Sequence, residues 1–227
     1  MLKVLYLDSH IVAIHKPPGM LVHRTRISDG KVFALQTLRD QLGQRVYPVH
    51  RLDRPTAGVL LFALRSEIAR LLVDTFSERR VRKSYRAIVR GHIHEAGRLD
   101  YPLTRDDGKK QQAVTAYQPL DTSEIMVPVD RYPTSRYSLM KIVPQTGRMH
   151  QIRKHFAHLR HPILNDRKHG DRHHNRMFRE KFSCDTMMLL AHSLEFEHPV
   201  RLETMRITTD PEPEMTRMLK LLNLKGL

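Results

Sequence analysis

The 227-residue sequence predicts an α+β fold with a mixed, mostly antiparallel sheet and flanking helices. Short apolar runs typical of strands alternate irregularly with segments whose apolar residues recur at helical spacing. Many links between them have the length of a hairpin turn. The chain length predicts one domain over residues 1–227, with room for a small lobe, and we find no repeat or long disordered linker in the sequence.

The chain begins with two apolar runs, Lys3–Leu7 and Ile11–His15, around a short polar turn, which predicts a β-hairpin. The prolines of Lys16–Gly19 end the second strand because proline cannot extend a ladder. Apolar spacing predicts a helix over Val32–Leu42. The continuous apolar run Val59–Leu64 predicts a buried strand.

The next helix is expected to follow Ser66, a predicted N-cap, with apolar residues at core spacing: Ile68, Leu71, Leu72 and Phe76. Further strands are predicted at Tyr85–Val89, Ala113–Tyr117, Tyr137–Val143 and Leu189–Phe196. Helices are predicted at about 147–160 and at Glu212–Leu224. The polar stretches 106–112 and 167–179 are expected to be loops, the second exposed and basic.

The charge of the chain indicates a polyanionic partner. Lys and Arg number 39 against 24 Asp and Glu, a formal net charge of +15, and the sequence pI is near 10.3. Nucleic acid is the usual partner of such a protein, although charge alone also fits a merely soluble basic protein. A membrane is disfavoured, because the basic residues are spread along the chain and we find no apolar run of about 18 residues. The N-terminus does not resemble a secretory signal, and a single cysteine, Cys184, fits a reducing cytoplasm.

Metal and cofactor chemistry find little support in the sequence. Fifteen histidines occur, but without an HExxH motif or zinc-ligand spacing. The glycine-rich signatures of nucleotide sites, GxxxxGK[ST] and GxGxxG, do not occur either. Cys184 has no neighbour in sequence that obviously activates a thiol nucleophile. We therefore expect neither a metal nor a cofactor.

A candidate nucleophile lies in the stretch VHRLDRPTAGVLL, residues 49–61, where Asp53 stands between Arg51 and Arg54. The residues after it have turn chemistry. Two nearby cations favour the ionised carboxylate, which is then available as a base or a nucleophile. A salt-bridged surface loop fits the same fragment.

The segment TGRMHQIRKHFAHLRHP, residues 146–162, adds two candidate arginines. On a helix, Met149, Ile152, Phe156 and Leu159 form one apolar stripe, with Arg148 and Arg153 near its opposite edges. Such cations can hold a carboxylate or a phosphate at the rim of the stripe. Two solvated arginines are the alternative, and periodicity does not choose between the readings.

Taken together, six segments resemble the motifs of RluA-type pseudouridine synthases: KPPG (Lys16–Gly19), HRLDRPTAG (His50–Gly58), KSYRA (Lys83–Ala87), TGRMHQIR (Thr146–Arg153), HPILNDRKHGD (161–171) and LAHSLEFEHP (190–199). The match runs through nearly the whole chain in order, without a separate RNA-binding domain. Asn165 replaces a glycine of the family pattern, and Leu190 a histidine found in many members. Both differences concern local loop geometry.

The resemblance implies a single catalytic domain with a central active-site cleft that isomerises uridine in RNA to pseudouridine without metal or cofactor. It implies that Asp53 is the nucleophile and that Arg153 is its ion partner. It also implies that Tyr85 stacks on the uracil and that its hydroxyl transfers a proton at C5. Attack at uracil C6, attack at ribose C1′ and an elimination route all stay open.

Arg51 resembles the family arginine that contacts RNA, and the further candidate contacts to RNA are His50, Arg148, Lys16, Arg172 and Arg176. The variants RPTAG (54–58) and RYPTSRY (131–137) resemble a branch that modifies tRNA, which implies uridine 65 of the T-stem as the target. No obligate protein partner is evident in the sequence, so a monomer is expected. An rRNA uridine or another tRNA uridine is the alternative target. Two other classes stay open: a non-catalytic RNA-binding module, and a glycosidase or nucleosidase, which usually needs a second carboxylate.

Overall fold

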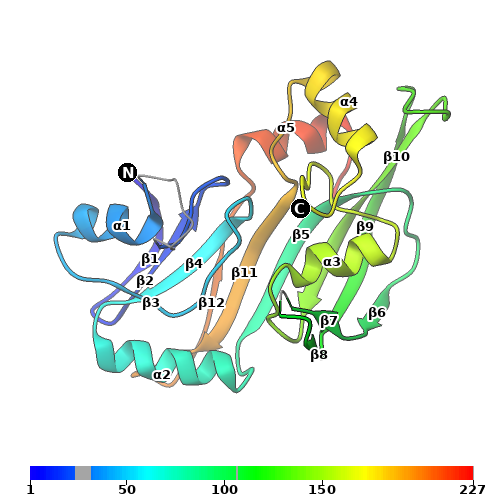
Figure 1. Ribbon diagram of the computed structural model, residues 1–227. Helices are drawn as coiled ribbons and strands as arrows, with labels where there is room; N and C mark the ends of the chain where they lie inside the picture. The colour runs from blue at the N-terminus through cyan, green and yellow to red at the C-terminus, as the bar shows by residue number, and fades with distance from the viewer. Residues whose placement is uncertain (24–31, 106, 227) are drawn as a thin grey trace. The chain divides into compact units, whose positions relative to one another are not determined.

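The computed structural model describes residues 1–23, 32–105 and 107–226 (Figure 1). The chain forms two compact units. The first unit contains residues 1–83 and 191–210, and the second contains residues 84–190 and 211–227. Helices and mostly antiparallel strands occur in both, which confirms the predicted α+β class.

The strands of the first unit begin with the predicted hairpin of β1 (Lys3–Leu7) and β2 (Ile11–Lys16). Strand β4 (Ala57–Ala63) pairs antiparallel with β2 and is buried at every residue, as its apolar run predicts. Strand β3 (Tyr47–Pro48) pairs with β4. Strand β11 (Leu189–Glu197) pairs with β12 (Thr204–Thr208). Strand β12 was not predicted from the sequence.

The described part of the first unit has two helices, α1 and α2. Helix α1 (Ala34–Leu42) agrees with the prediction and ends at Gly43, whose φ of 66° is left-handed. Helix α2 (Ser66–Ser77) begins at Ser66 itself, and Arg65 occupies the N-cap position. The predicted cap was therefore wrong, because Ser66 lies inside the helix and its hydroxyl bonds to Glu67. Residues Ile68 and Leu72 pack into the core of the unit, whereas Leu71 is exposed.

Neighbouring strands of the second unit follow the order β5 (Arg82–Arg90), β10 (Ser135–Pro144), β9 (Val114–Ile125) and β6 (Gly97–Asp100). These pairings are antiparallel. Strands β7 (Leu103–Thr104) and β8 (Lys110–Gln111) form a small separate ladder. The stretch 106–112 was predicted to be all loop, but two of its residues form β8; residue 106 lies outside the described part of the chain.

Helix α3 (Gln151–His158) is shorter than the predicted helix over 147–160. It begins only after His150, whose φ of 56° is left-handed and interrupts helical geometry. Helix α4 (Arg172–Phe182) forms where an exposed basic loop was predicted. The prediction failed because the Asp171 carboxylate caps the helix and the buried pair Met177 and Phe178 anchors it.

Helix α5 (Pro213–Leu221) agrees with the predicted terminal helix, with proline in its first turn. The apolar core of the second unit collects residues from β5, β10 and α3 with the segments that flank them: Ala87, Val89, Ile93, Met140, Ile142, Ile152, Phe156, Ile163, Met187 and Leu189. No helix in the described ranges has the length and apolar character needed to cross a membrane.

Candidate functional site

Asp53 lies on a turn between β3 and β4 in the first unit and is half-buried. The turn is closed by a hydrogen bond of 3.0 Å from the Thr56 amide to the Asp53 carbonyl oxygen. Gly58 begins the following ladder with a φ of 119°, and a Cβ there would lie 2.3 Å from the carbonyl oxygen of Ala191. Glycine is therefore required where the turn ends. We call residues 50–58, which contain this turn, the Asp53 loop.

Lys16, at the end of β2, supports the Asp53 loop through hydrogen bonds to the backbone. Its side chain is fully buried, and its ammonium donates to the carbonyl oxygens of Pro17 (2.9 Å), Met20 (2.9 Å) and Arg54 (3.2 Å). The same Arg54 carbonyl accepts from the Gly19 amide at 2.9 Å. These hydrogen bonds to backbone carbonyl groups give Lys16 a structural role, and its predicted phosphate contact stays a prediction.

His50 connects the Asp53 loop to β4. Its Nε2 accepts a hydrogen bond of 3.0 Å from the Leu61 amide, and its ring stacks on Phe76 with centroids 4.7 Å apart. An acceptor at Nε2 requires a neutral ring with the proton on Nδ1. Burial, followed by the charge of Lys83, lowers the pKa of His50 to about 3. A neutral, stacked ring favours a structural role over the predicted contact with RNA.

The two arginines that flank Asp53 are both exposed. Arg54 donates from Nε to the carbonyl oxygen of Gly19 at 3.0 Å, which adds a further link between the KPPG segment and the Asp53 loop. The exposure of Arg51 is compatible with the contact to RNA that the sequence predicts. Charges in this setting are screened by water and salt.

In the second unit, the segment TGRMHQIR folds around the side chain of Gln151. Its Oε1 accepts from the Thr146 hydroxyl (2.6 Å) and the Arg148 amide (3.0 Å), and its Nε2 donates to the Val114 carbonyl oxygen (2.9 Å). Gln151 and Thr146 are both buried. This network connects the start of α3 to β9 and positions the helix that follows.

Arg148 and Arg153 are separated by the start of α3. Arg148 precedes the helix, so the predicted stripe with an arginine at each edge is wrong. The Arg148 guanidinium is partly exposed and donates from Nε to the Gln112 carbonyl oxygen at 3.1 Å. Arg153 lies on α3 and is only 5% exposed. Helical periodicity did not distinguish the two arginines, but the structure places them in different environments.

Arg153 forms a two-point ion pair with Asp166, a residue that the sequence analysis did not single out. The Arg153 Nε and Nη2 atoms lie 2.7 Å and 2.8 Å from the two carboxylate oxygens. The side chain of Asp166 is 1% exposed. Asp166 belongs to the quoted segment HPILNDRKHGD, so the signal was present, but the spacing does not reveal which cation the carboxylate meets.

The two departures from the family pattern have local explanations. Asn165 has a φ of 60°, a left-handed conformation that suits glycine and that asparagine tolerates best among the other residues. Its side-chain amide donates to the carbonyl oxygens of Cys184 (3.2 Å) and Thr186 (3.1 Å), which glycine could not do. Leu190 is fully buried and adds apolar contact in β11. The turn that carries Asp166 is therefore intact.

Tyr85 lies on β5 opposite Ile142 of β10 and packs against the apolar core of the second unit. The remaining predicted contacts lie on α4. Arg172 and Arg176 are exposed, as is Arg179, and their spacing places them along one face of the helix. We call these three residues the basic face of α4.

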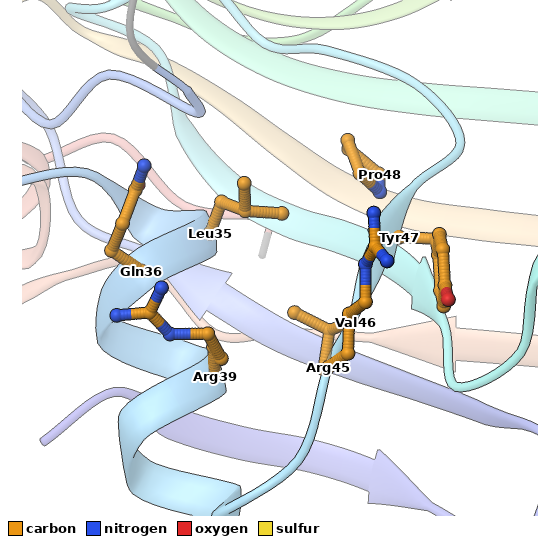
Figure 2. A pocket seen from close by; sticks show the side chains of 7 residues that line it. All are labelled: Leu35, Gln36, Arg39, Arg45, Val46, Tyr47 and Pro48. Carbon is orange, nitrogen blue, oxygen red and sulfur yellow. The ribbon is translucent and has the colours of Figure 1, made fainter.

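A cavity of about 250 Å³ lies between α1 and β3 (Figure 2), lined by Leu35, Gln36, Arg39, Arg45, Val46, Tyr47 and Pro48. Arg45 stacks over the ring of Tyr47 at 5.1 Å. The lining contains none of the predicted site residues. Among the described residues, no group of three His, Cys, Asp or Glu side chains could hold a metal ion.

Comparison with known proteins points to one family. Residues 10–158 match the family model described as RNA pseudouridylate synthase. The tRNA pseudouridine synthase C of Vibrio cholerae is 50% identical over 211 residues, which cover 88% of this chain and 86% of that protein. The enzyme of the same name from Haemophilus influenzae is 44% identical and covers 96% and 97%. The solved structure of human RNA pseudouridylate synthase domain containing 4 is similar with a TM-score of 0.76 and 26% identity, covering 99% and 94%.

Proposed function

The chain belongs to the RNA pseudouridylate synthase family, and we propose that it converts a uridine of tRNA to pseudouridine, with uridine 65 of the T-stem as the target. The similarity to enzymes named tRNA pseudouridine synthase C, over most of both chains, supports the choice of tRNA. The net charge of +15 suits a polyanionic substrate. The reaction breaks the N-glycosidic bond, turns the base and forms a C-glycosidic bond, so no atom is gained or lost.

Asp53 is the proposed nucleophile. The observation that carries this role is the construction of its loop: Lys16, His50 and Gly58 fix the backbone on both sides of Asp53, from which the carboxylate extends. The carboxylate can attack uracil C6 or ribose C1′, or promote loss of the base by elimination. Each of these routes regenerates the carboxylate at the end of the cycle.

Arg153 and Tyr85 complete the proposed catalytic set. Arg153 is the proposed ion partner of Asp53, a role that suits its buried, oriented guanidinium. Tyr85 gives the flipped uracil an aromatic face, and its hydroxyl transfers the proton at C5. The target base leaves its stack to reach them.

The RNA itself is bound by exposed cations. Arg51, beside the nucleophile, is proposed to contact the position that the flipped base vacates. Arg148 and the basic face of α4 are proposed to contact phosphates. These contacts orient the substrate and take no part in the bond changes.

The test is loss of the reaction in Asp53→Asn. We expect release of tritium from C5-labelled uridine in tRNA to fall to the uncatalysed level, while the dissociation constant for tRNA stays within about threefold of wild type, because the lost carboxylate does not attract a polyanion. Mapping pseudouridine in tRNA and rRNA from cells with and without the protein identifies the target.

The alternatives predict other products. Free uracil would indicate a glycosidase, and unchanged RNA with wild-type protein would indicate a binding module. A new pseudouridine in rRNA alone would replace the tRNA assignment. Wild-type turnover by Asp53→Asn would remove Asp53 from the mechanism.

A further inference from the structure

We propose that Asp166 is a positioning residue for the reaction, because it fixes the direction in which Arg153 presents its guanidinium. This inference rests on the proposed function. It gives Asp166 a role through Arg153, without a contact to the substrate.

The geometry of the ion pair carries the proposal. Two atoms of one guanidinium edge, Nε and Nη2, are bonded to the two oxygens of one carboxylate. Because the guanidinium is planar and rigid, fixing two of its nitrogens also fixes its plane and the direction of the third, Nη1. With side-chain exposures of 6% and 1%, neither partner has space to take another rotamer readily.

Asp166 is itself held in place by bonds that do not involve Arg153. Its Oδ1 accepts from the amides of Lys168 (2.9 Å) and His169 (3.0 Å). Its carbonyl oxygen accepts from the Gly170 amide at 2.9 Å and from the Asn175 side chain at 3.0 Å. A Cβ at Gly170 would lie 2.1 Å from that carbonyl oxygen, so the turn requires glycine. The carboxylate is thus a fixed reference point for the arginine.

The ion pair of Arg153 and Asp166 has no formal net charge. Burial by itself raises the pKa of Asp166, but the hydrogen bonds from Arg153 and from the His169 amide outweigh it, and the pKa falls below its usual value. The carboxylate therefore stays ionised and neutralises Arg153 formally. What Arg153 then brings to the reaction is a set of directed N–H donors, whose value depends on orientation.

The experiment compares Asp166→Asn with wild type in single-turnover reactions on tRNA at saturating enzyme. Asparagine keeps the shape and one acceptor oxygen but places an NH₂ group against an arginine donor, so the guanidinium must turn. We expect the single-turnover rate to fall by about 10- to 100-fold, because small misplacements of catalytic groups have effects of that size. The dissociation constant for tRNA should change by less than about threefold.

Asp171→Asn is the matched control. Asp171 also pairs with an arginine, Arg90, and loss of this charge pair should lower the unfolding temperature, while asparagine can still cap α4. At a temperature where both variants are folded, Asp171→Asn should keep the wild-type single-turnover rate. A general loss of stability would slow both variants equally, and that result would overturn the positioning role.

Two further arms separate the possible failures. If Asp166→Asn does not fold, Asp166→Glu keeps the charge while its extra methylene displaces the guanidinium, and we expect a rate about 10-fold below wild type. A wild-type rate in the folded Asp166 variant overturns the proposal. If Asp53→Asn is inactive in the same assay, only the role of Asp166 has failed; if Asp53→Asn is active, the proposed mechanism has failed with it.

Discussion

The Asp53 loop and helix α3 hold their functional side chains by different means. In the first unit, the backbone around Asp53 is fixed by a buried ammonium, Lys16, and by a neutral histidine, His50. In the second unit, the side chain of Arg153 is itself held, through a buried ion pair with Asp166. In the first unit the backbone that carries Asp53 is fixed, whereas in the second unit the side chain of Arg153 is fixed.

This difference has a consequence for how each region fails. A loop that depends on backbone contacts loosens when a supporting side chain is lost, but its carboxylate keeps its chemistry. A guanidinium held by a charge loses its orientation when that charge is removed, and the remaining buried ion is costly. Variants that support the Asp53 loop should therefore lower mainly stability, whereas loss of Arg153 should lower both stability and turnover.

The largest effect is expected for Arg153→Ala. Removing the cation leaves Asp166 buried without its partner, and breaking such a pair typically costs about 3–5 kcal/mol of unfolding free energy. Turnover should fall by about 100-fold or more, because the proposed partner of Asp53 is lost with it. Single-turnover rates and chemical unfolding measure the two effects.

Arg148→Ala is the control for that prediction. The Arg148 guanidinium is partly exposed and donates to the Gln112 carbonyl oxygen, so its loss should weaken RNA binding and leave the unfolding free energy within about 0.5 kcal/mol of wild type. If Arg148→Ala loses the chemical step while Arg153→Ala keeps it, the two roles are reversed.

Lys16→Met tests the brace beneath the Asp53 loop. Methionine fills a similar volume but donates no hydrogen bond, so the carbonyl groups of Pro17 and Met20 lose this donor. Leaving a buried polar group unsatisfied costs about 1–3 kcal/mol, and we expect a destabilisation of about 2 kcal/mol in urea unfolding. Lys3→Met, at an exposed position on β1, should be close to neutral. Equal stability of the two variants would refute the bracing role.

The two regions should also differ in acid. Burial lowers the pKa of His50 in the folded protein to about 3, from an ordinary value of 6.5. Its contribution to stability is therefore complete above pH 6.5 and is lost as the pH falls from 6.5 towards 3, by at most about 1.4 kcal/mol per pH unit. The pKa of Asp166 is lowered from 3.8, so its contribution persists until the pH falls below 3.8.

His50→Gln makes this difference measurable. Glutamine does not titrate, but its side-chain oxygen can accept the Leu61 amide. The unfolding temperature of the variant should fall less than that of wild type between pH 6.5 and 4. Parallel curves over this range would mean that His50 does not contribute to the acid sensitivity.

The smallest effect per residue is expected on the basic face of α4. Arg172→Glu and Arg176→Glu should each reduce the slope of log affinity for tRNA against log salt by about 1, because a neutralised phosphate is lost. The single-turnover rate at saturating enzyme should stay unchanged. Arg98→Glu, an exposed position on β6, serves as the matched charge reversal and should change the slope less. Equal slopes for all three variants would assign the salt dependence to net charge alone.

Apolar patterning by itself determined most of the elements. The hairpin of β1 and β2 and the buried strand β4 follow from short apolar runs, and helix α1 follows from apolar residues at helical spacing, because these patterns are local properties of the sequence. The quoted motifs also singled out Asp53 and Arg153, and the fold class was confirmed. Helix α4 was not predicted, because charged residues outnumber its two buried residues. The capping role of Asp171 is also not evident from the sequence, since it depends on how its side chain meets the amides of the first turn.

Only the tertiary structure decided which groups meet. Asp166 and Arg153 are 13 residues apart, and their pairing depends on the left-handed turn at Asn165 and on the late start of α3. Likewise, the burial of Lys16 depends on the approach of the Arg54 carbonyl, 38 residues away. The sequence shows which charged residues are present. The strength of an ion pair depends on the distance between the charges and on their desolvation, and both are determined only when the chain is packed.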